Sequence, residues 1–500
     1  MLKTDTKTIY GDFQTPPSLA ELMMDILDTL DFSPNCIIEP TCGVGEILMK
    51  ADNRFHPKLS FGVEINPEYV NTFKAKINGK SSYIILNGSI FDYLITIEKQ
   101  SKSFETILLV GNPPWVTNSE IGAMNGNNLP RKYNIKGLKG IDAITGKSNF
   151  DIGEYILWKL IEIFHQKNCV FAFLCKTIVA RNLLKLLWDN AIQFKDASIY
   201  PIDSKKYFNA AVDACFFVIN FSTKLKKQTC CIFNSIENRV LDKKYGYFNQ
   251  MIINNYDFFS SHNYFGTSDY IWRNGVKHDC SKVMELKKTS NEYINGYGEI
   301  VNIESDLIFP LYKSSDLSKH FPAIKKYVII TQKSVGEDTS YIKYQYPSAW
   351  LYLNKYYNSF VERKSSIYKN KPPFSIFSIG EYSFSPYKIA ISSLYKKILF
   401  HKISSIENKI IMVDDTCNFI SCYSSEEADF VHSLLSSDEV CGYLNSVIFW
   451  DNKRPITIEL LNRLDLLKVS IKLGLENMYH SFVRKNKVTK KNNNIQLNLF

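Results

Sequence analysis

Strand-like and helix-like segments alternate between residues 16 and 221, and this alternation constrains the fold more than any other feature of the sequence. Short apolar runs predict strands, and apolar residues spaced three and four apart predict helices with one buried face. The expected strands are 36–39, 61–65, 83–86, 106–110, 169–175 and 213–221. The expected helices are 16–30, 45–52, 67–77, 150–164 and 177–190. The pattern is typical of a doubly wound, mostly parallel α/β sheet with helices on both faces.

The periodicity becomes irregular after a polar, basic junction at residues 222–229. We therefore predict one domain over 1–224, an α+β domain over 225–476 and a basic, flexible tail over 477–500. Residues 1–224 hold 24 Lys and Arg against 23 Asp and Glu, whereas 225–500 hold 36 against 27. A basic excess suits a polyanionic partner, although a solvated basic surface explains it equally well.

Several classes of protein lack support in the sequence. The first 14 residues have no apolar core for a signal peptide, and the most apolar stretch, 169–180, is short and interrupted by Lys176, so we expect no membrane segment. Eleven cysteines without a repeated Cys-x-x-Cys pair favour reduced thiols and no zinc or other metal site. No phosphate-binding loop ending in Gly-Lys-Ser/Thr is present, which disfavours an NTPase.

Acidic residues, glycines, prolines and an asparagine follow the predicted strands, at the edge where open α/β sheets bind ligands. The first strand ends at Glu39 and enters a glycine-containing turn, EPTCGVG, and the second ends at Glu64, whose carboxylate suits a ribose. Taken singly, an ordinary turn and a surface glutamate explain these features as well. The segment NPPW, Asn112–Trp115, is more specific, because a structural turn rarely needs an amide, two prolines and an aromatic together.

The segments GDFQTPP, EPTCGVG, VEINP, NGSIFD, NPPW and YFNAAVDACFFVI, in this order, resemble the motif series of S-adenosylmethionine-dependent DNA adenine-N6 methyltransferases of the gamma class. The second half is similar to the C-terminal part of restriction-modification methyltransferases at 272–280, 309–316, 374–384 and 449–457. The resemblance implies a Rossmann-like catalytic domain over 1–224 and a DNA target-recognition domain over 225–476. It also implies a cytoplasmic, nucleoid-associated bacterial enzyme that acts on duplex DNA.

The resemblance assigns most cofactor contacts to the strand ends. It places Thr15 at the methionine carboxylate and Glu39 at the methionine amino group of S-adenosylmethionine. Glu64 is expected to hold the ribose, and Ile65 to lie against the adenine ring.

Other positions complete the expected cofactor site. Gly43 and Gly45 are expected to make room for the cofactor, and Asn112 to border it. Ser89 stands where the family usually has an aspartate for the adenine amino group, and Asp92 follows three residues later. This departure leaves the adenine contact without its usual partner.

The segment Asn112–Trp115 suits methyl transfer to an exocyclic amine. The Asn112 side-chain oxygen and the Pro113 carbonyl each accept one amine hydrogen, and Pro114 keeps the turn rigid. Because the target nitrogen lies inside a duplex, the base must be flipped out. Trp115 is expected to cover one face of the base and Phe208 the other, with Tyr207 as the alternative.

Contacts to DNA are expected from basic residues of the second domain, although any one of them is more often a surface residue. The candidates are Lys313, Lys333, Lys364, Lys388, Lys453 and Arg454. A separately encoded cognate restriction endonuclease is a possible partner. The last residues, Gln496–Phe500, resemble the peptide by which bacterial replication proteins bind the sliding clamp, and a packed C-terminal strand is the alternative.

Rival substrates share the same chemistry. Cytosine N4, guanine amines of RNA and glutamine amides of proteins are also methylated next to an Asn-Pro-Pro-aromatic turn. A DNA-binding subunit without activity is the contrasting class, but it has no reason to keep both Glu39 and Asn112.

Overall fold

The computed structural model describes residues 13–116, 151–289, 292–319 and 324–484. The chain forms two compact units, Met1–Asp257 and Phe258–Phe500. The clamp-like segment Gln496–Phe500 lies outside the described residues.

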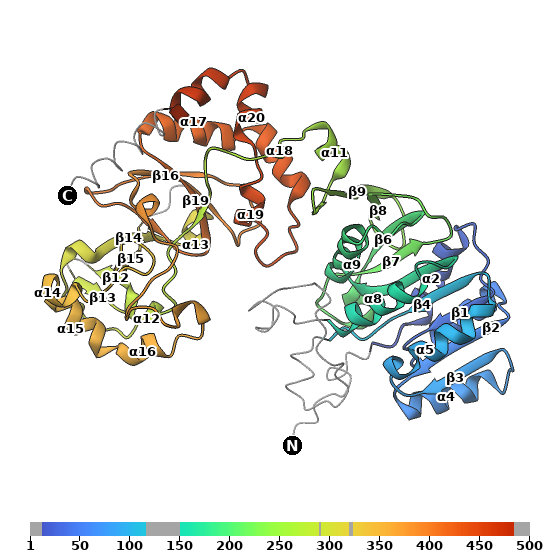
Figure 1. Cartoon of the computed structure of the whole chain (residues 1–500). Helices are drawn as coiled ribbons and strands as arrows, with labels where there is room; N and C mark the ends of the chain where they lie inside the picture. Colours follow the sequence, from blue (N-terminus) through green and yellow to red (C-terminus); the bar gives the residue numbers. More distant parts are fainter. Residues whose placement is uncertain (1–12, 117–150, 290–291, 320–323, 485–500) are drawn as a thin grey trace. The chain divides into compact units, whose positions relative to one another are not determined.

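A large sheet forms the centre of the first unit (Figure 1). Its described strands follow the order β10-β9-β8-β6-β7-β5-β4-β1-β2-β3. The five strands from β3 to β5 are parallel, and β7 is antiparallel to both β5 and β6. The strands are β1 (Cys36–Glu39), β2 (Leu59–Glu64), β3 (Tyr83–Asn87), β4 (Ile107–Gly111), β5 (Cys169–Lys176), β6 (Asp196–Ile202), β7 (Ala214–Asn220), β8 (Thr229–Phe233), β9 (Leu241–Phe248) and β10 (Met251–Ile253).

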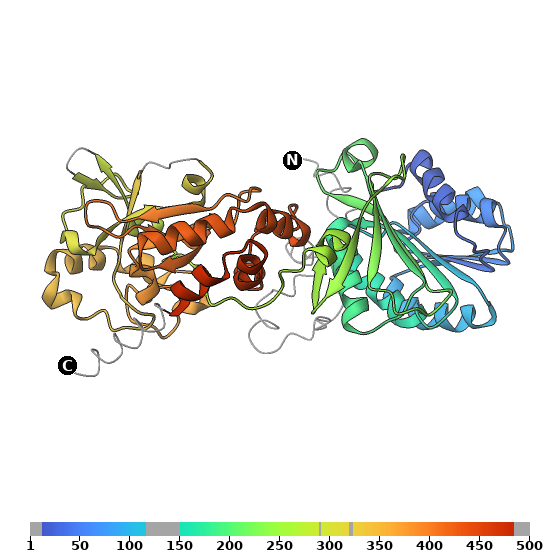
Figure 2. The same ribbon diagram turned by 90° about the horizontal axis from the view of Figure 1, so that it is seen from above.

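Helices cover both faces of this sheet, as Figure 2 shows. Helices α2, α3 and α4 pack on one face, where their apolar side chains form a core with β1, β4 and β5, and α5, α8 and α9 pack on the other. The helices are α2 (Pro17–Asp28), α3 (Glu46–Phe55), α4 (Pro67–Ile77), α5 (Ile90–Gln100), α8 (Ile152–Phe164), α9 (Thr177–Asp189), α10 (Ser204–Phe208) and α11 (Tyr256–Ser261). The doubly wound α/β prediction is confirmed.

Local sequence explains where several helices begin. Pro17 occupies the first turn of α2, where a missing N–H costs nothing. Asn66 caps α4 by accepting a hydrogen bond from Glu68 N, and Pro67 follows it. Asp151 caps α8 in the same way, by accepting from Gly153 N at 2.9 Å. These caps start each helix directly after a strand end or loop at the carboxyl edge of the parallel strands.

Several features of the first unit differ from the sequence prediction. The expected strands and helices omit β6, α5 and the short helix α10. The β6 sequence contains Asp196, Ser198 and Pro201, which weaken its strand signal. The sheet also continues past residue 224, the predicted domain end, because β8 pairs with β6 and carries β9 and β10 with it. The first compact unit therefore ends at Asp257.

The second unit mixes sheets and helices, which confirms the predicted α+β class. One sheet has the order β11-β19-β16-β17 and the other β13-β12-β15-β14-β18. The strands are β11 (Arg273–Asn274), β12 (Glu285–Thr289), β13 (Glu292–Ile294), β14 (Ile308–Tyr312), β15 (Lys326–Ile329), β16 (Tyr387–Ser392), β17 (His401–Ser404), β18 (Met412–Val413) and β19 (Cys417–Cys422). The helices are α12 (Ser281–Met284), α13 (Ser314–Leu317), α14 (Ile342–Gln345), α15 (Pro347–Lys355), α16 (Tyr357–Val361), α17 (Ser425–Leu435), α18 (Asp438–Val447), α19 (Ile458–Leu461) and α20 (Leu466–Lys472).

The first described residues of the predicted flexible tail, 477–484, are helical. The helix begins at residue 476, and the side chains of Tyr479 and Val483 are buried. The Tyr479 ring packs edge-on against Tyr270, 5.8 Å away between ring centroids. These apolar anchors hold the start of the basic segment on the second unit. In the described part of the chain, no helix has the length and apolarity needed to cross a membrane.

Candidate functional site

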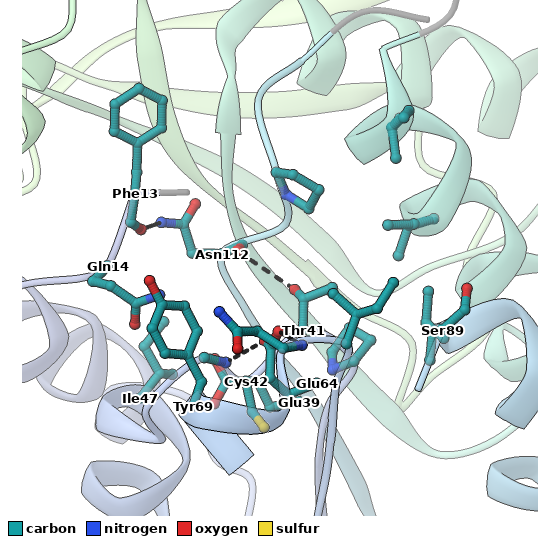
Figure 3. A pocket seen from close by; sticks show the side chains of 18 of the residues that line it. Phe13, Gln14, Glu39, Thr41, Cys42, Ile47, Glu64, Tyr69, Ser89 and Asn112 are labelled. Carbon is teal, nitrogen blue, oxygen red and sulfur yellow. Dashed lines mark hydrogen bonds between the residues drawn. The ribbon is translucent and has the colours of Figure 1, made fainter. Parts of the chain in front are cut away.

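A cavity of about 700 Å³ lies at the carboxyl ends of β1, β2, β3 and β4 (Figure 3). It is where the parallel strands of the sheet end together, as the sequence predicted for the ligand site. Seven of the eight residues predicted to contact the cofactor line it. They are Thr15, Glu39, Gly43, Glu64, Ile65, Ser89 and Asn112.

Glu64, at the end of β2, holds two loops of the cavity together. Its Oε2 accepts a hydrogen bond from Gly43 N at 2.9 Å, and its Oε1 accepts from Asn66 N at 2.7 Å. Glu64 lines the cavity, where a carboxylate matches the hydroxyls of a ribose. Ile65 follows at the rim with a side chain 51% exposed, which leaves an apolar face open for a flat ring.

Glu39, at the end of β1, is the deepest acid of the cavity. Its Oε2 accepts a hydrogen bond from Leu48 N in α3 at 3.0 Å. Burial raises the pKa of Glu39 well above its ordinary value, and the nearby charge of Glu64 raises it further. A cationic group in the cavity would offset this cost, which suits the predicted contact with an amino group.

The two glycines of the EPTCGVG turn have different roles. Gly43 has a φ of +52° and lines the cavity, where a Cβ would meet the Gln14 side chain at 2.5 Å. Gly45 has a φ of +85°, and a Cβ there would meet the Phe73 ring of α4 at 2.3 Å. Gly45 is not among the cavity residues, so its expected part in making room for the cofactor stays a prediction. Its function is to let α3 start close to α4.

Ser89 lines the cavity at the start of α5, and its hydroxyl does not cap that helix. Asp92 is exposed one turn later and is not among the lining residues. Gln14, Tyr69 and Phe91 are among the lining side chains that sequence reasoning missed. Each stands within five residues of a predicted site residue. This closeness in sequence is the signal by which the three side chains could have been predicted.

Asn112, directly after β4, is fixed by the segment that precedes α2. Its Nδ2 donates to Phe13 O at 2.8 Å and lies 3.2 Å from Thr15 Oγ1 (Figure 3 shows the bond to Phe13). Its Oδ1 is shielded from solvent and has no hydrogen-bond partner among the residues that the structure describes. Asn112 therefore lines the cavity with an amide oxygen that no described group pairs with.

The start of α8 braces the Asn112–Trp115 turn. Ile152 N donates to Val116 O at 3.0 Å, and Gly153 comes so close that a Cβ there would lie 3.0 Å from Pro114 O. Lys176 Nζ, at the end of β5, donates to Asp151 Oδ2 at 2.8 Å and anchors the cap of α8. Two prolines and this close packing keep the turn open and rigid. Pro114 lines the cavity, whereas Pro113 is not among its lining residues.

Three aromatic rings meet beside this turn. The ring centroids of Trp115 and Phe208 are 5.1 Å apart at an interplanar angle of 75°, and Phe13 lies 5.3 Å from Trp115 and 5.8 Å from Phe208. Phe208 is therefore the ring that pairs with Trp115, whereas Tyr207 donates its hydroxyl to Glu237 at 2.9 Å. The two rings touch edge to face. Parallel faces around a base need about 7 Å, twice a carbon–carbon contact distance, so the rings must part to admit one.

The structure separates the six basic candidates for DNA contacts. Lys333, Lys364 and Lys453 are exposed. The other three have partners within the protein. Lys313 Nζ pairs with Glu285 at 2.7 Å, and the exposed Arg454 pairs with Asp415 at 3.5 Å.

Lys388 is the candidate that the structure overturns. It lies on β16 with only 2% of its surface exposed, and its Nζ donates to Ser385 O at 3.1 Å. The strand is a central one of its sheet and is buried along the KIAI run, so this side chain is enclosed by protein. Burial lowers the pKa of Lys388 from 10.5 to about 7. It does not contact DNA from this position.

Replacing Lys388 by methionine is expected to raise the free energy of unfolding by about 1–3 kcal/mol below pH 7, because the buried cation is removed while the stem volume is kept. Above pH 7 the folded protein has released this proton and the unfolded chain has not, so wild-type stability rises with pH and the advantage of the variant shrinks toward pH 10. Denaturant unfolding of both proteins at pH 6 and pH 9 measures this. An equal or larger advantage at pH 9 would contradict it.

Comparisons with known proteins show similarity to methyltransferases of restriction-modification systems. The chain is 42% identical over 471 residues to the type II methyltransferase M.NspV of Nostoc sp. (strain ATCC 29411 / PCC 7524), covering 92% of this chain and 97% of that protein. It is 25% identical over 182 residues to the modification methylase CviBIII of Paramecium bursaria Chlorella virus NC1A, covering 36% and 41% of the two chains. The type IIL restriction-modification enzyme MmeI in complex with DNA aligns with 95% of this chain and 75% of its own, at 12% identity and a TM-score of 0.48. No family model matches the chain.

Proposed function

The chain belongs to the type II DNA methyltransferases, and on this premise we propose that it methylates N6 of an adenine flipped out of duplex DNA. The observation that carries the proposal is Asn112, a residue that lines the cavity, whose Oδ1 has no hydrogen-bond partner among the described residues and which stands in the same turn as Trp115. S-adenosylmethionine is the cofactor of this family, and it supplies an electrophilic methyl group bound to a sulfonium sulfur. The sulfur keeps the carbon–sulfur electron pair and leaves as a neutral thioether.

The cavity suits this cofactor in its chemistry. The Glu64 carboxylate lines the cavity and matches the hydroxyls of a ribose, and the half-exposed Ile65 matches a flat base. Burial raises the pKa of Glu39, and an ammonium group bound beside it would favour the ionised carboxylate and pair with it. Ser89 stands where the adenine amino group is expected, and its hydroxyl oxygen is an acceptor in place of the usual carboxylate.

The protein must prepare a poor nucleophile. The lone pair of an exocyclic amine is delocalised into the ring, and it becomes available only when the nitrogen turns pyramidal. A hydrogen bond to Asn112 Oδ1, with a second one to the Pro113 carbonyl, draws both amine hydrogens to one side. These bonds strengthen as positive charge develops on the nitrogen, so they stabilise the transition state more than the ground state. The proton is lost to solvent after the new carbon–nitrogen bond has formed.

The test is methyl transfer by the full chain. Duplex DNA and cofactor with a labelled methyl group are incubated with the protein, and the nucleosides are separated after digestion. We expect N6-methyladenine at one sequence, which modification-sensitive sequencing then reads. N4-methylcytosine, or label in RNA or protein alone, would overturn the proposal. In a restriction-modification pair, the proposed partner is a separately encoded endonuclease that cuts the same unmethylated sequence.

A further inference from the structure

The segment Phe13–Thr15, which we call the N-terminal strap, lies between the cavity and the aromatic rings. The Phe13 ring touches Trp115, and Gln14 Oε1 accepts a hydrogen bond from Val44 N at 3.3 Å. Thr15 is 8% exposed and lines the cavity. The strap thus touches the proposed base site, the glycine turn and the cavity within three consecutive residues.

The strap decides which way the Asn112 amide points. A backbone carbonyl can only accept, so the atom 2.8 Å from Phe13 O must be Nδ2 and not Oδ1. Thr15 Oγ1, at 3.2 Å, takes the second hydrogen of the same nitrogen. Both donors of the amide are then used inside the protein. The oxygen is left on the opposite side, where the structure describes no partner for it.

We propose that Thr15 is a positioning residue for methyl transfer, because its hydroxyl keeps the Asn112 oxygen turned toward the target amine. The proposal rests on the proposed function. A flipped amide would present two N–H donors to an amine that itself donates, and the activating bond would be lost. The hydroxyl hydrogen of Thr15 is not used by this contact, so the residue can also donate to a cofactor carboxylate.

The two roles of Thr15 predict different kinetics. If Thr15 acts only on the cofactor, Thr15→Val raises the cofactor Kd and leaves kcat at saturating cofactor unchanged. If it positions Asn112, the same variant lowers kcat at saturating cofactor about 10-fold, the equivalent of one hydrogen bond of about 1.4 kcal/mol. Thr15→Ser keeps the oxygen and is expected to restore kcat to within about 3-fold of wild type, and a thermal melt checks that each variant is folded.

A double variant tests the route through Asn112. With Asn112 already replaced by alanine, adding Thr15→Val is expected to cause no further loss of kcat. Thr72→Val is the matched control, because the Thr72 hydroxyl bonds Glu68 O on the exposed side of α4. An unchanged kcat in Thr15→Val, no rescue by serine, or a full additive loss in the double variant would each overturn the positioning role. Failure of the wild-type protein to methylate adenine in DNA would instead overturn the proposed function.

Discussion

Replacing Asn112 by alanine is expected to lower kcat about 10²–10³-fold at saturating cofactor and DNA. The loss is that of one preorganised acceptor that strengthens its bond as charge develops. Asn112 Oδ1 has no partner to lose among the described residues, but the variant also removes the Nδ2 that donates to Phe13 O and Thr15 Oγ1, so a thermal melt checks that it is folded. Single-turnover kinetics with labelled cofactor measure the chemical step directly, and cofactor Kd is expected to change little.

Asn190→Ala controls for the loss of an asparagine. Its side chain donates to Leu186 O at the end of α9 and is exposed. If Asn190→Ala turns over at the wild-type rate and Asn112→Ala loses about 10²-fold, the two results together support the mechanism. If Asn112→Ala kept more than about a third of the wild-type rate, the activation of the amine would have to come from elsewhere.

Affinity for duplex DNA is expected to fall about 10³-fold between 50 and 200 mM salt. This is the loss for about six phosphate contacts, because each lysine or arginine that binds a phosphate releases a condensed counterion. Residues 225–500 hold 36 basic against 27 acidic side chains, which supplies the contacts. Fluorescence anisotropy of a labelled duplex, titrated with the full chain at several salt concentrations, gives the slope.

Single variants then identify the contacts. Lys364→Gln and Lys453→Gln remove exposed charges, and each that touches a phosphate is expected to lower the slope by about one. The buried Lys388→Met is the matched control and is expected to leave the slope unchanged, although it removes the same side chain type. A slope near zero for the wild-type protein would contradict electrostatic binding. An effect of Lys388→Met equal to the others would contradict its burial.

The predictability of the site depends on how local its signals are. Glu39, Glu64 and Asn112 were recognisable because each stands at the end of a short apolar strand, and the parallel sheet brings such ends to one edge. The roles of Gly45 and Lys388 depend instead on the tertiary packing around them. Periodicity within one segment cannot identify these neighbours. The strap contact is non-local in the same sense, since Thr15 and Asn112 are 97 residues apart.

The domain boundary was missed for a related reason. A basic junction at 222–229 interrupts the regular alternation, and sequence alone gives no pairing partner for the strands after this junction. In the structure β8 runs parallel to β6, a strand that was absent from the expected set. Asp196 and Pro201 weaken the strand signal of β6, so this strand was not predicted. The strands β8, β9 and β10 join the sheet through β6 and therefore could not be assigned to it.

In the proposed mechanism, the edge-to-face contact between Trp115 and Phe208 makes Phe208 compete with the flipped base for contact with the Trp115 ring. An edge-to-face ring pair is worth about 0.5–1.5 kcal/mol beyond its buried area, and an entering base must replace it. Stacking of a base on an aromatic ring returns about 1–3 kcal/mol. The exchange is favourable for a base that covers both rings and close to neutral for one that covers little of either. Because Phe208 must be displaced, bases are distinguished by the area that they stack on the rings as well as by their hydrogen bonds. The larger ring system of a purine is favoured over a pyrimidine.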